Sequence, residues 1–335
     1  MRAARRDASR PAGPPRRVPP LAAGLLAAAL ASGCATSSLQ HPEISAAEAP
    51  YPRAVELRQT PFFPDDTHYC GPAALATLLA HSSVPVTAEA LIDRVYLPEQ
   101  QGSLQHELLG AARRADRVPY ELAPELSALL TEISRGHPVL VLQNLTLELL
   151  PQWHYAVVVG YDLASETVTL RSADERRRTI SMSRFERTWQ RAGRWAVVIP
   201  PPGRTPASAD ADGWVAAVSE LERQERWHAA HRAYLAATAR WPDHAEAWLG
   251  LGNVHYTAER LALAQSAFER AVQADGTLAA AHYNLAWALL RQGETAEAVA
   301  AAPRAEAAAP DHPRYSQAAD EILAEAGPGS DAADD

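Results

Sequence analysis

The C-terminal third of the chain repeats with a period of 34 residues. In its middle unit, bulky and small apolar residues stand at fixed spacings, and similar residue types recur 34 positions before and after them. A unit of this length is one helical hairpin, which cannot bury its apolar face alone. Stacked units must therefore share a core, and residues 213–326 are restricted to an array of helical hairpins.

The spacing resembles that of the tetratricopeptide repeat. Small residues stand where two helices touch, and bulky residues fill the groove between them. The middle unit contributes Trp248, Leu251, Gly252, Ala264, Phe268 and Ala271. The outer units contribute His282, Leu285, Ala286, Ala298, Ala302 and Ala305, and Trp214, Ala217, Val218, Ala230, Tyr234 and Ala237. The outer units are less regular, and an unrelated helical array is the alternative. The resemblance implies repeats that bind a protein partner.

Composition indicates an ordinary globular chain long enough for two domains. The 335 residues are 47% hydrophobic and 21% charged, and the net charge is −9. Residues 1–33 carry a net charge of +5, so the chain without them carries −14. Such an acidic chain is a poor candidate for binding nucleic acid.

Residues 1–33 have the pattern of a secretory signal peptide. An Arg- and Pro-rich start precedes a short apolar run, Leu21–Ala31, which is too short to span a membrane. The run ends in Ser32-Gly33-Cys34 and resembles a bacterial lipobox. This resemblance implies that Cys34 is lipidated and anchors the protein in the outer membrane, facing the periplasm. An ordinary signal peptide cut nearby is the alternative. Residues 34–60 are then expected to be a tether.

Residues 61–202 are expected to form one domain in which helices precede strands. Apolar patterns and capping residues predict four helices, beginning at Gly71, Thr87, Ser103 and Leu122. The period then changes and predicts four strands, over 138–144, 153–162, 167–172 and 195–199. This order is typical of an α+β fold with an antiparallel sheet. A linker over 203–212 leads to the repeats, and an acidic tail over 327–335 is predicted to be disordered.

Cys70 is the candidate nucleophile. It precedes Gly71 and Pro72, and proline suits the first position of a helix. The unpaired amide groups at a helix N-terminus favour a negative charge and lower the pKa of a thiol there. Cys34 is the only other cysteine, so a lipidated Cys34 leaves Cys70 without a disulfide partner. The alternative is a small buried core residue.

His154 is the candidate general base, because it lies on an apolar strand of the predicted sheet. The other histidines of the domain are less well placed, being His68, His81, His106 and His137. Pairing across the predicted hairpin places Asp174 opposite His154 as the orienting residue, or Ser172 if the register slips by two. A hydrogen-bonded core histidine is the alternative for His154.

Several motifs together resemble the papain-like cysteine peptidases. They are Pro61-Phe62-Phe63-Pro64, Cys70-Gly71-Pro72-Ala73-Ala74-Leu75, Gly102-Ser103-Leu104-Gln105, Pro138 to Asn144, Trp153-His154-Tyr155-Ala156-Val157 and Leu170-Arg171-Ser172. The branch they resemble is related to the double-glycine leader peptidases of bacteriocin exporters, in the form of bacterial lipoproteins with C-terminal tetratricopeptide repeats. The resemblance implies a papain-like α+β domain in which Cys70 is the nucleophile and His154 the general base.

The sequence departs from that pattern at two positions. Relatives carry a glutamine five or six residues before the cysteine, whose amide donates to the oxyanion hole, whereas Asp65 and Pro64 stand here. A carboxylate has no donor and repels a developing oxyanion, which leaves the Cys70 amide as the donor of the oxyanion region. Leader peptidases also place Asp-Pro where this chain has Ser172-Ala173.

These features support three hypotheses about function. The first is a lipid-anchored cysteine peptidase in the cell envelope that cuts a peptide or protein substrate and uses its repeats to bind a partner. The second is a catalytically weak or inactive adaptor that binds peptides, and the third is a thiol acyltransferase. No cofactor and no metal ion are expected for any of them.

Overall fold

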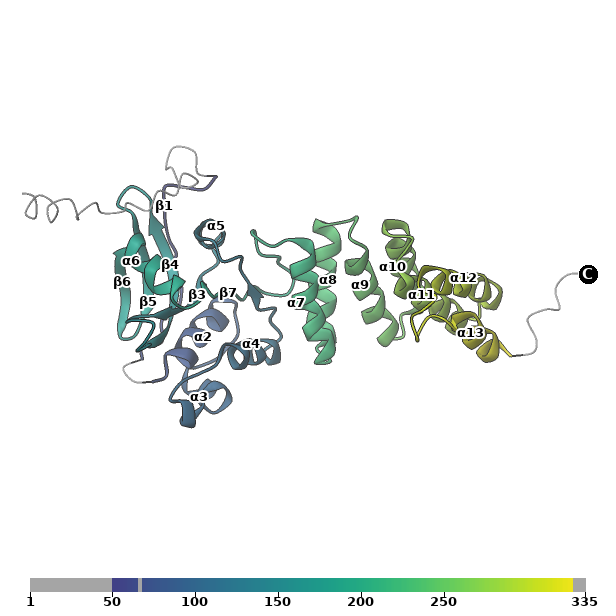
Figure 1. Cartoon of the computed structure of the whole chain (residues 1–335), viewed down its shortest axis with the longest axis horizontal. Helices are drawn as coiled ribbons and strands as arrows, with labels where there is room; N and C mark the ends of the chain where they lie inside the picture. The colour runs from purple at the N-terminus through teal and green to yellow at the C-terminus, as the bar shows by residue number, and fades with distance from the viewer. Residues whose placement is uncertain (1–49, 66–67, 328–335) are drawn as a thin grey trace, which may run out of the picture. The chain divides into compact units, whose positions relative to one another are not determined.

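The computed structural model describes residues 50–65 and 68–327 (Figure 1). The predicted signal peptide, the lipidation site Cys34, most of the tether and residues 328–335 lie outside this part of the chain. Within the described residues, no helix combines the length and the apolar character needed to cross a membrane.

Among the described residues, one antiparallel sheet of seven strands forms the centre of the N-terminal domain. The strands are β1 (Ala54–Glu56), β2 (Tyr120–Glu121), β3 (Val139–Asn144), β4 (Trp153–Asp162), β5 (Thr167–Ser172), β6 (Glu175–Ser181) and β7 (Ala196–Val198). Their order is β2-β7-β3-β4-β5-β6, and β1 pairs with the far end of β4. The α+β class predicted from the sequence is therefore confirmed.

Helices cover both faces of this sheet, because the apolar residues of the central strands alternate between two cores. Leu142 and Tyr155 face the core that includes α2 (Cys70–His81). Val141 and Ala156, their neighbours along the strands, face the core with α5 (Leu126–Ser134) and α6 (Met182–Gln190). The remaining helices of this domain are α3 (Glu89–Val95), a 3-10 turn (Pro98–Gln100) and α4 (Gln105–Arg114).

Three details of the domain differ from the sequence predictions. The helix predicted from Leu122 begins at Leu126, because Leu122 extends a strand and its N–H donates to the carbonyl of Ala196. Ser103 does not cap α4, whose N-cap residue is Leu104. Strand β1 pairs with β4, so the sheet begins inside the stretch expected to be a tether.

Strand β6 and helix α6 were not predicted. β6 is an edge strand made of charged and polar residues with mostly exposed side chains, so it lacks the apolar signal of the other strands. α6 is short, and Phe185 and Trp189 point its apolar face into the core.

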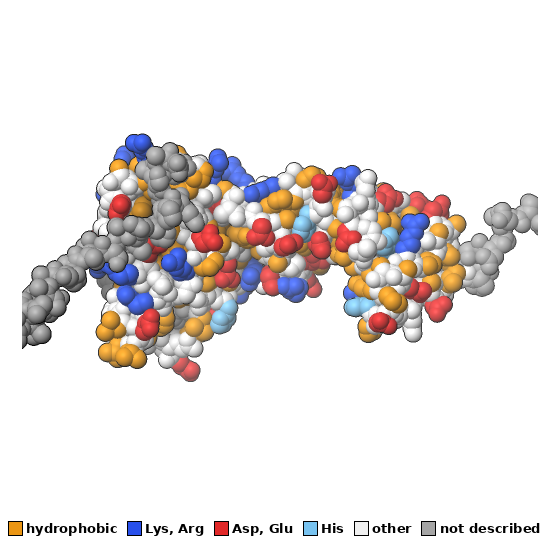
Figure 2. Space-filling model, turned by 45° about the horizontal axis from the view of Figure 1, so that its top comes forward, with side chains coloured by type: hydrophobic (Ala, Val, Ile, Leu, Met, Phe, Trp, Pro, Cys, Tyr) orange, Lys and Arg blue, Asp and Glu red, His pale blue; other side chains and the backbone are white. Residues whose placement is uncertain are grey.

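Up to residue 327, where the described part of the chain ends, seven helices follow the sheet domain. They are α7 (Ala211–Arg223), α8 (Trp227–Arg240), α9 (Ala245–Thr257), α10 (Leu261–Ala274), α11 (Ala279–Gln292), α12 (Thr295–Ala308) and α13 (Ala318–Ala326). Ala230, Ala264 and Ala298, which are 34 residues apart, each have 0% exposure. The small residues of the repeat therefore stand at the helix contacts, as the spacing predicts. Figure 2 shows acidic and basic side chains mixed over the visible face.

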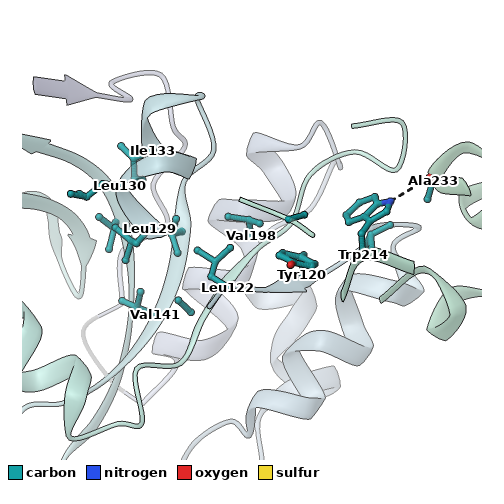
Figure 3. Packing of buried hydrophobic residues seen from close by; sticks show 14 of the residues in the cluster. Tyr120, Leu122, Leu129, Leu130, Ile133, Val141, Val198, Trp214 and Ala233 are labelled. Carbon is teal, nitrogen blue, oxygen red and sulfur yellow. Dashed lines mark hydrogen bonds between the residues drawn. The ribbon is translucent and has the colours of Figure 1, made fainter. Parts of the chain in front are cut away.

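The core of the sheet domain continues into the first repeat (Figure 3). Trp214 of α7 is fully buried, lies 6.1 Å from the ring of Tyr120, and donates through its indole N–H to the carbonyl of Ala233 at 3.3 Å. The hydroxyl of Tyr120 donates to Asp210, the N-cap of α7, at 3.2 Å. The linker therefore does not separate two independent cores.

Candidate active site

Cys70 is the first residue of α2, and the start of this helix is pressed against the loop before α4. A Cβ atom added at Gly71 would lie 2.5 Å from the hydroxyl oxygen of Ser103, which is closer than real Cβ atoms approach. The hydroxyl of Tyr155 also donates to the Ser103 carbonyl at 3.1 Å. Glycine after the cysteine is thus required by the close approach of this loop.

The environment of Cys70 raises the pKa of its thiol, against the lowering expected at a helix N-terminus. Burial is the largest cause, and the charge of Asp65 adds to it. The backbone N–H groups of Tyr155, Gly71 and Cys70 act in the opposite direction by favouring the thiolate, but they do not outweigh burial. The resting group is therefore a neutral thiol.

His154 lies near the start of β4 with one ring nitrogen held. Its Nε2 atom lies 2.8 Å from the hydroxyl oxygen of Ser172 on β5. Among the described residues, its Nδ1 atom has no hydrogen-bond partner. Burial lowers the pKa of His154 and Arg178 lowers it further, whereas Asp65 raises it. The imidazole is therefore neutral at neutral pH and can accept a proton.

Cys70 and His154 line the same cleft of about 650 Å³. Of the backbone N–H groups that favour the Cys70 thiolate, the one with the largest effect belongs to Tyr155, the residue after His154 on β4. The charge of Asp65 acts on both the thiol and the imidazole. The structure thus brings the predicted nucleophile and the predicted base to one site from residues 84 positions apart.

Asp174, the first candidate for the orienting residue, lines the same cavity as His154 but has no hydrogen bond or ion pair with it among the described residues. Strand β5 ends at Ser172, and Ala173, with a φ of 53°, and Asp174 form the turn into β6. Asp174 is therefore exposed at the tip of a hairpin, and Ser172, the second candidate, makes the contact. The predicted register missed this, because the sequence does not show where the strand ends.

Asp65 stands near both reacting groups in the part of the oxyanion region that precedes Cys70. It is only 8% exposed, and its Oδ1 atom accepts a hydrogen bond from the N–H of Tyr69 at 3.2 Å. The backbone N–H of Asp65 donates to the carbonyl of Ala173 at 3.0 Å, which connects Asp65 to the turn between β5 and β6. A buried carboxylate therefore lies close enough to act on both Cys70 and His154.

A second cavity of about 370 Å³ lies on the other side of His154. Gln143 lines it, stands opposite His154 in the pairing of β3 with β4, and is 2% exposed. Its Nε2 atom donates to the hydroxyl of Thr188 at 2.6 Å. The sequence analysis did not single out Gln143, although a polar residue in a buried strand facing the predicted base was a usable signal.

An apolar rim lies on the turn between β3 and β4 and meets the cleft at Trp153. Leu147, Leu149, Leu150 and Trp153 are 68%, 92%, 76% and 54% exposed. The turn is held by Asn144, whose side-chain oxygen accepts from the N–H groups of Thr146 and Gln152. Exposed apolar side chains therefore lie beside one edge of the cleft.

The other histidines of the domain have different surroundings. His68 is exposed and also lines the cleft. His81 donates through Nε2 to the carbonyl of Gly136, His137 pairs with Glu132, and His106 is exposed beside Glu107.

Comparison with protein families finds three matching regions. Residues 53–197 match the Peptidase_C39 like family, and residues 215–279 and 255–322 match tetratricopeptide repeats. Among curated proteins, no sequence matches significantly.

Solved structures similar to parts of the chain include a C39-like peptidase and repeat proteins. A C39-like peptidase from Bacillus anthracis has 18% identity and a TM-score of 0.38, with 44% of this chain and 96% of that chain covered. The TPR2B-domain:pHsp70 complex of yeast Sti1 has 19% identity and a TM-score of 0.32, with 35% and 94% covered. The Yersinia enterocolitica chaperone SycD in complex with a peptide of YopD has 17% identity and a TM-score of 0.32, with 34% and 88% covered.

Proposed function

We propose that the protein is a cysteine peptidase, because residues 53–197 match the Peptidase_C39 like family and the helices that follow match tetratricopeptide repeats. The observation that supports the proposal is the position of Cys70 and His154 on one cleft, with Nε2 of His154 held by Ser172. In this arrangement Nδ1 is the nitrogen left for the thiol proton.

The proposed reaction begins from a neutral pair. Nδ1 of His154 takes the thiol proton as the sulfur of Cys70 attacks the carbonyl carbon of a peptide bond. The imidazolium returns this proton to the leaving amine as the C–N bond breaks, which leaves a thioester. A water molecule, deprotonated by His154, then hydrolyses the thioester and restores the thiol.

The oxyanion region limits the rate of this reaction. The N–H of Cys70 can donate to the oxyanion, but the nearby carboxylate of Asp65 opposes the negative charge. We therefore expect a slow peptidase at neutral pH. The apolar rim, formed by Leu147, Leu149, Leu150 and Trp153, favours extended substrates with apolar side chains beside the cleft.

A non-catalytic adaptor is the second candidate. The raised pKa of Cys70 disfavours the thiolate, and the charge of Asp65 disfavours both the thiolate and the oxyanion. In this case the cleft binds a peptide without cutting it, and the repeats bind a partner in either case. We also propose that a lipid on Cys34 holds the protein at the outer membrane, facing the periplasm.

The deciding experiment measures hydrolysis of unstructured fluorogenic peptides by the chain from residue 35 onward. Cys70→Ala and His154→Ala should abolish turnover, and His106→Ala, a change of an exposed histidine outside the cleft, should retain it. Turnover that survives Cys70→Ala would overturn the peptidase assignment. Peptide binding that persists with no turnover in any variant would favour the adaptor.

A further inference from the structure

A third cavity, of about 500 Å³, lies where the peptidase domain meets the first repeat. The C-terminal end of α2, the turn at residues 135–138 and the segment at residues 199–204 form its walls, and Arg232 of α8 reaches it from the repeats. It shares no lining residue with the cleft of Cys70 and His154. Its volume is in the range of small-molecule sites.

Three exposed arginines are among the residues that line this cavity. Arg135, Arg204 and Arg232 line it together with His81 and His137, and no Asp or Glu is among the described residues that line it. The guanidinium groups of the three arginines have no hydrogen bond or ion pair with any described residue. In a chain of net charge −9, this is a local excess of positive charge.

The buried carboxylate of Glu132 does not compensate this charge. Glu132 has 0% exposure and lies beneath His137, whose Nδ1 atom is 2.6 Å from its Oε2. Its Oε1 accepts from both the N–H and the hydroxyl of Ser208 at 2.6 Å. Both carboxylate oxygens of Glu132 therefore already have partners, and neither partner is one of the three arginines.

A fourth arginine adds to the excess from behind the wall. The guanidinium of Arg117 donates to the hydroxyl and the carbonyl of Ser82, at 3.0 and 2.7 Å. Burial lowers the pKa of Arg117, the charge of Asp116 raises it, and the charge of Arg232 lowers it by a smaller amount. Arg117 and Arg232 thus repel each other, and an anion beside Arg232 would reduce that repulsion.

The walls that carry these arginines are held in place. The segment at residues 199–204 contains Pro200 and Pro201, and Arg232 lies across Gly203, where an added Cβ atom would be 3.4 Å from its Nη2. His81 donates to the carbonyl of Gly136 at 3.0 Å and so holds the turn beside Arg135.

We propose that this cavity binds a phosphate-bearing anion, which bridges the peptidase domain and the first repeat. Several guanidinium forks around one space suit tetrahedral oxygens, because each fork donates two parallel N–H bonds. The cavity exceeds the size of one phosphate ion, so a phosphorylated small molecule or a phospholipid headgroup is the class of ligand. The site is independent of the chemistry at Cys70.

The test is titration calorimetry of the chain from residue 35 onward with inorganic phosphate and with pyrophosphate, at an ionic strength kept constant with chloride. Saturable binding at one site is expected, together with a melting temperature that rises with pyrophosphate concentration. Arg204→Gln with Arg232→Gln should weaken binding at least about tenfold. The matched control, Arg94→Gln with Arg260→Gln, removes two exposed arginines elsewhere and should leave binding unchanged.

Two further arms complete the test. Arg204→Gln alone changes a side chain with no hydrogen bond or ion pair to a described residue, so weaker pyrophosphate binding in this folded variant supports the site directly. Co-sedimentation with phosphatidylglycerol vesicles, if it depends on Arg204 and Arg232, assigns the ligand to a lipid headgroup, and pyrophosphate binding alone assigns it to a soluble phosphate. Absence of saturable binding, or equal binding by the double variant and its control, would overturn the proposal.

Discussion

The Nε2 atom of His154 lies 2.8 Å from the hydroxyl oxygen of Ser172, and Nδ1 has no hydrogen bond to any described residue. A serine hydroxyl orients the ring, but it carries no charge to stabilise an imidazolium. His154 can therefore act as a general base, but Ser172 stabilises its imidazolium form less than a carboxylate would.

Ser172→Ala should reduce kcat by up to about tenfold, because it removes one neutral hydrogen bond that orients the base. Steady-state hydrolysis and a melting curve for each variant measure this. Asp174→Ala, at the exposed turn two residues on, is the matched control and should keep full activity. An equal loss in both variants would show that Asp174 acts on His154 despite its position.

Asp65→Gln should increase turnover by about tenfold or more. The change removes a carboxylate that opposes the oxyanion and supplies an amide donor, and one such donor contributes about 100-fold or more in rate elsewhere. Asp65→Asn removes the same charge with a shorter amide and separates the two effects. Lower turnover in a folded Asp65→Gln protein would contradict this account of the oxyanion region.

Alkylation of Cys70 by iodoacetamide should rise with pH and reach its midpoint above that of a free cysteine. Burial and Asp65 raise the pKa of the thiol, so the thiolate forms only at higher pH. Because the pKa of Cys70 is higher in the folded protein than in the unfolded protein, the folded state favours the protonated thiol. The resulting stabilisation is fully present below the pKa of Cys70 in the unfolded protein. It is lost as pH rises through the pKa of Cys70 in the folded protein.

Asp65→Asn should move the alkylation midpoint to lower pH, because it removes a charge that raises the thiol pKa. On the acid side, activity should persist to a pH below the ordinary pKa of histidine, since burial lowers the pKa of His154. A midpoint at or below that of free cysteine would contradict the neutral resting pair.

Trp214→Ala should lower the free energy of unfolding by about 3–5 kcal/mol, because it empties a fully buried site in the core shared by the sheet and the first repeat. Urea unfolding measures the change. Trp153→Ala is the matched control, since that side chain is 54% exposed and should cost far less. Comparable losses would mean that the shared core does not couple the two regions.

The sequence alone predicted the two architectures and their order. The 34-residue spacing depends only on neighbouring helices within the array, so local patterns specify it. In the same way, the apolar strands β3, β4 and β5 were visible because burial on both faces leaves a strong apolar run. The pair Cys70 and His154 followed from the residue types and the elements that carry them.

Tertiary structure decided the remaining properties of the site. The end of β5 placed Ser172 rather than Asp174 on His154, and the packing of α2 against β4 buried Cys70 enough to reverse the expected shift of its pKa. It also collected Arg135, Arg204 and Arg232 from three separate segments around one cavity. Strand ends, desolvation and the meeting of distant charges depend on contacts between residues far apart in the chain, and local sequence does not encode them.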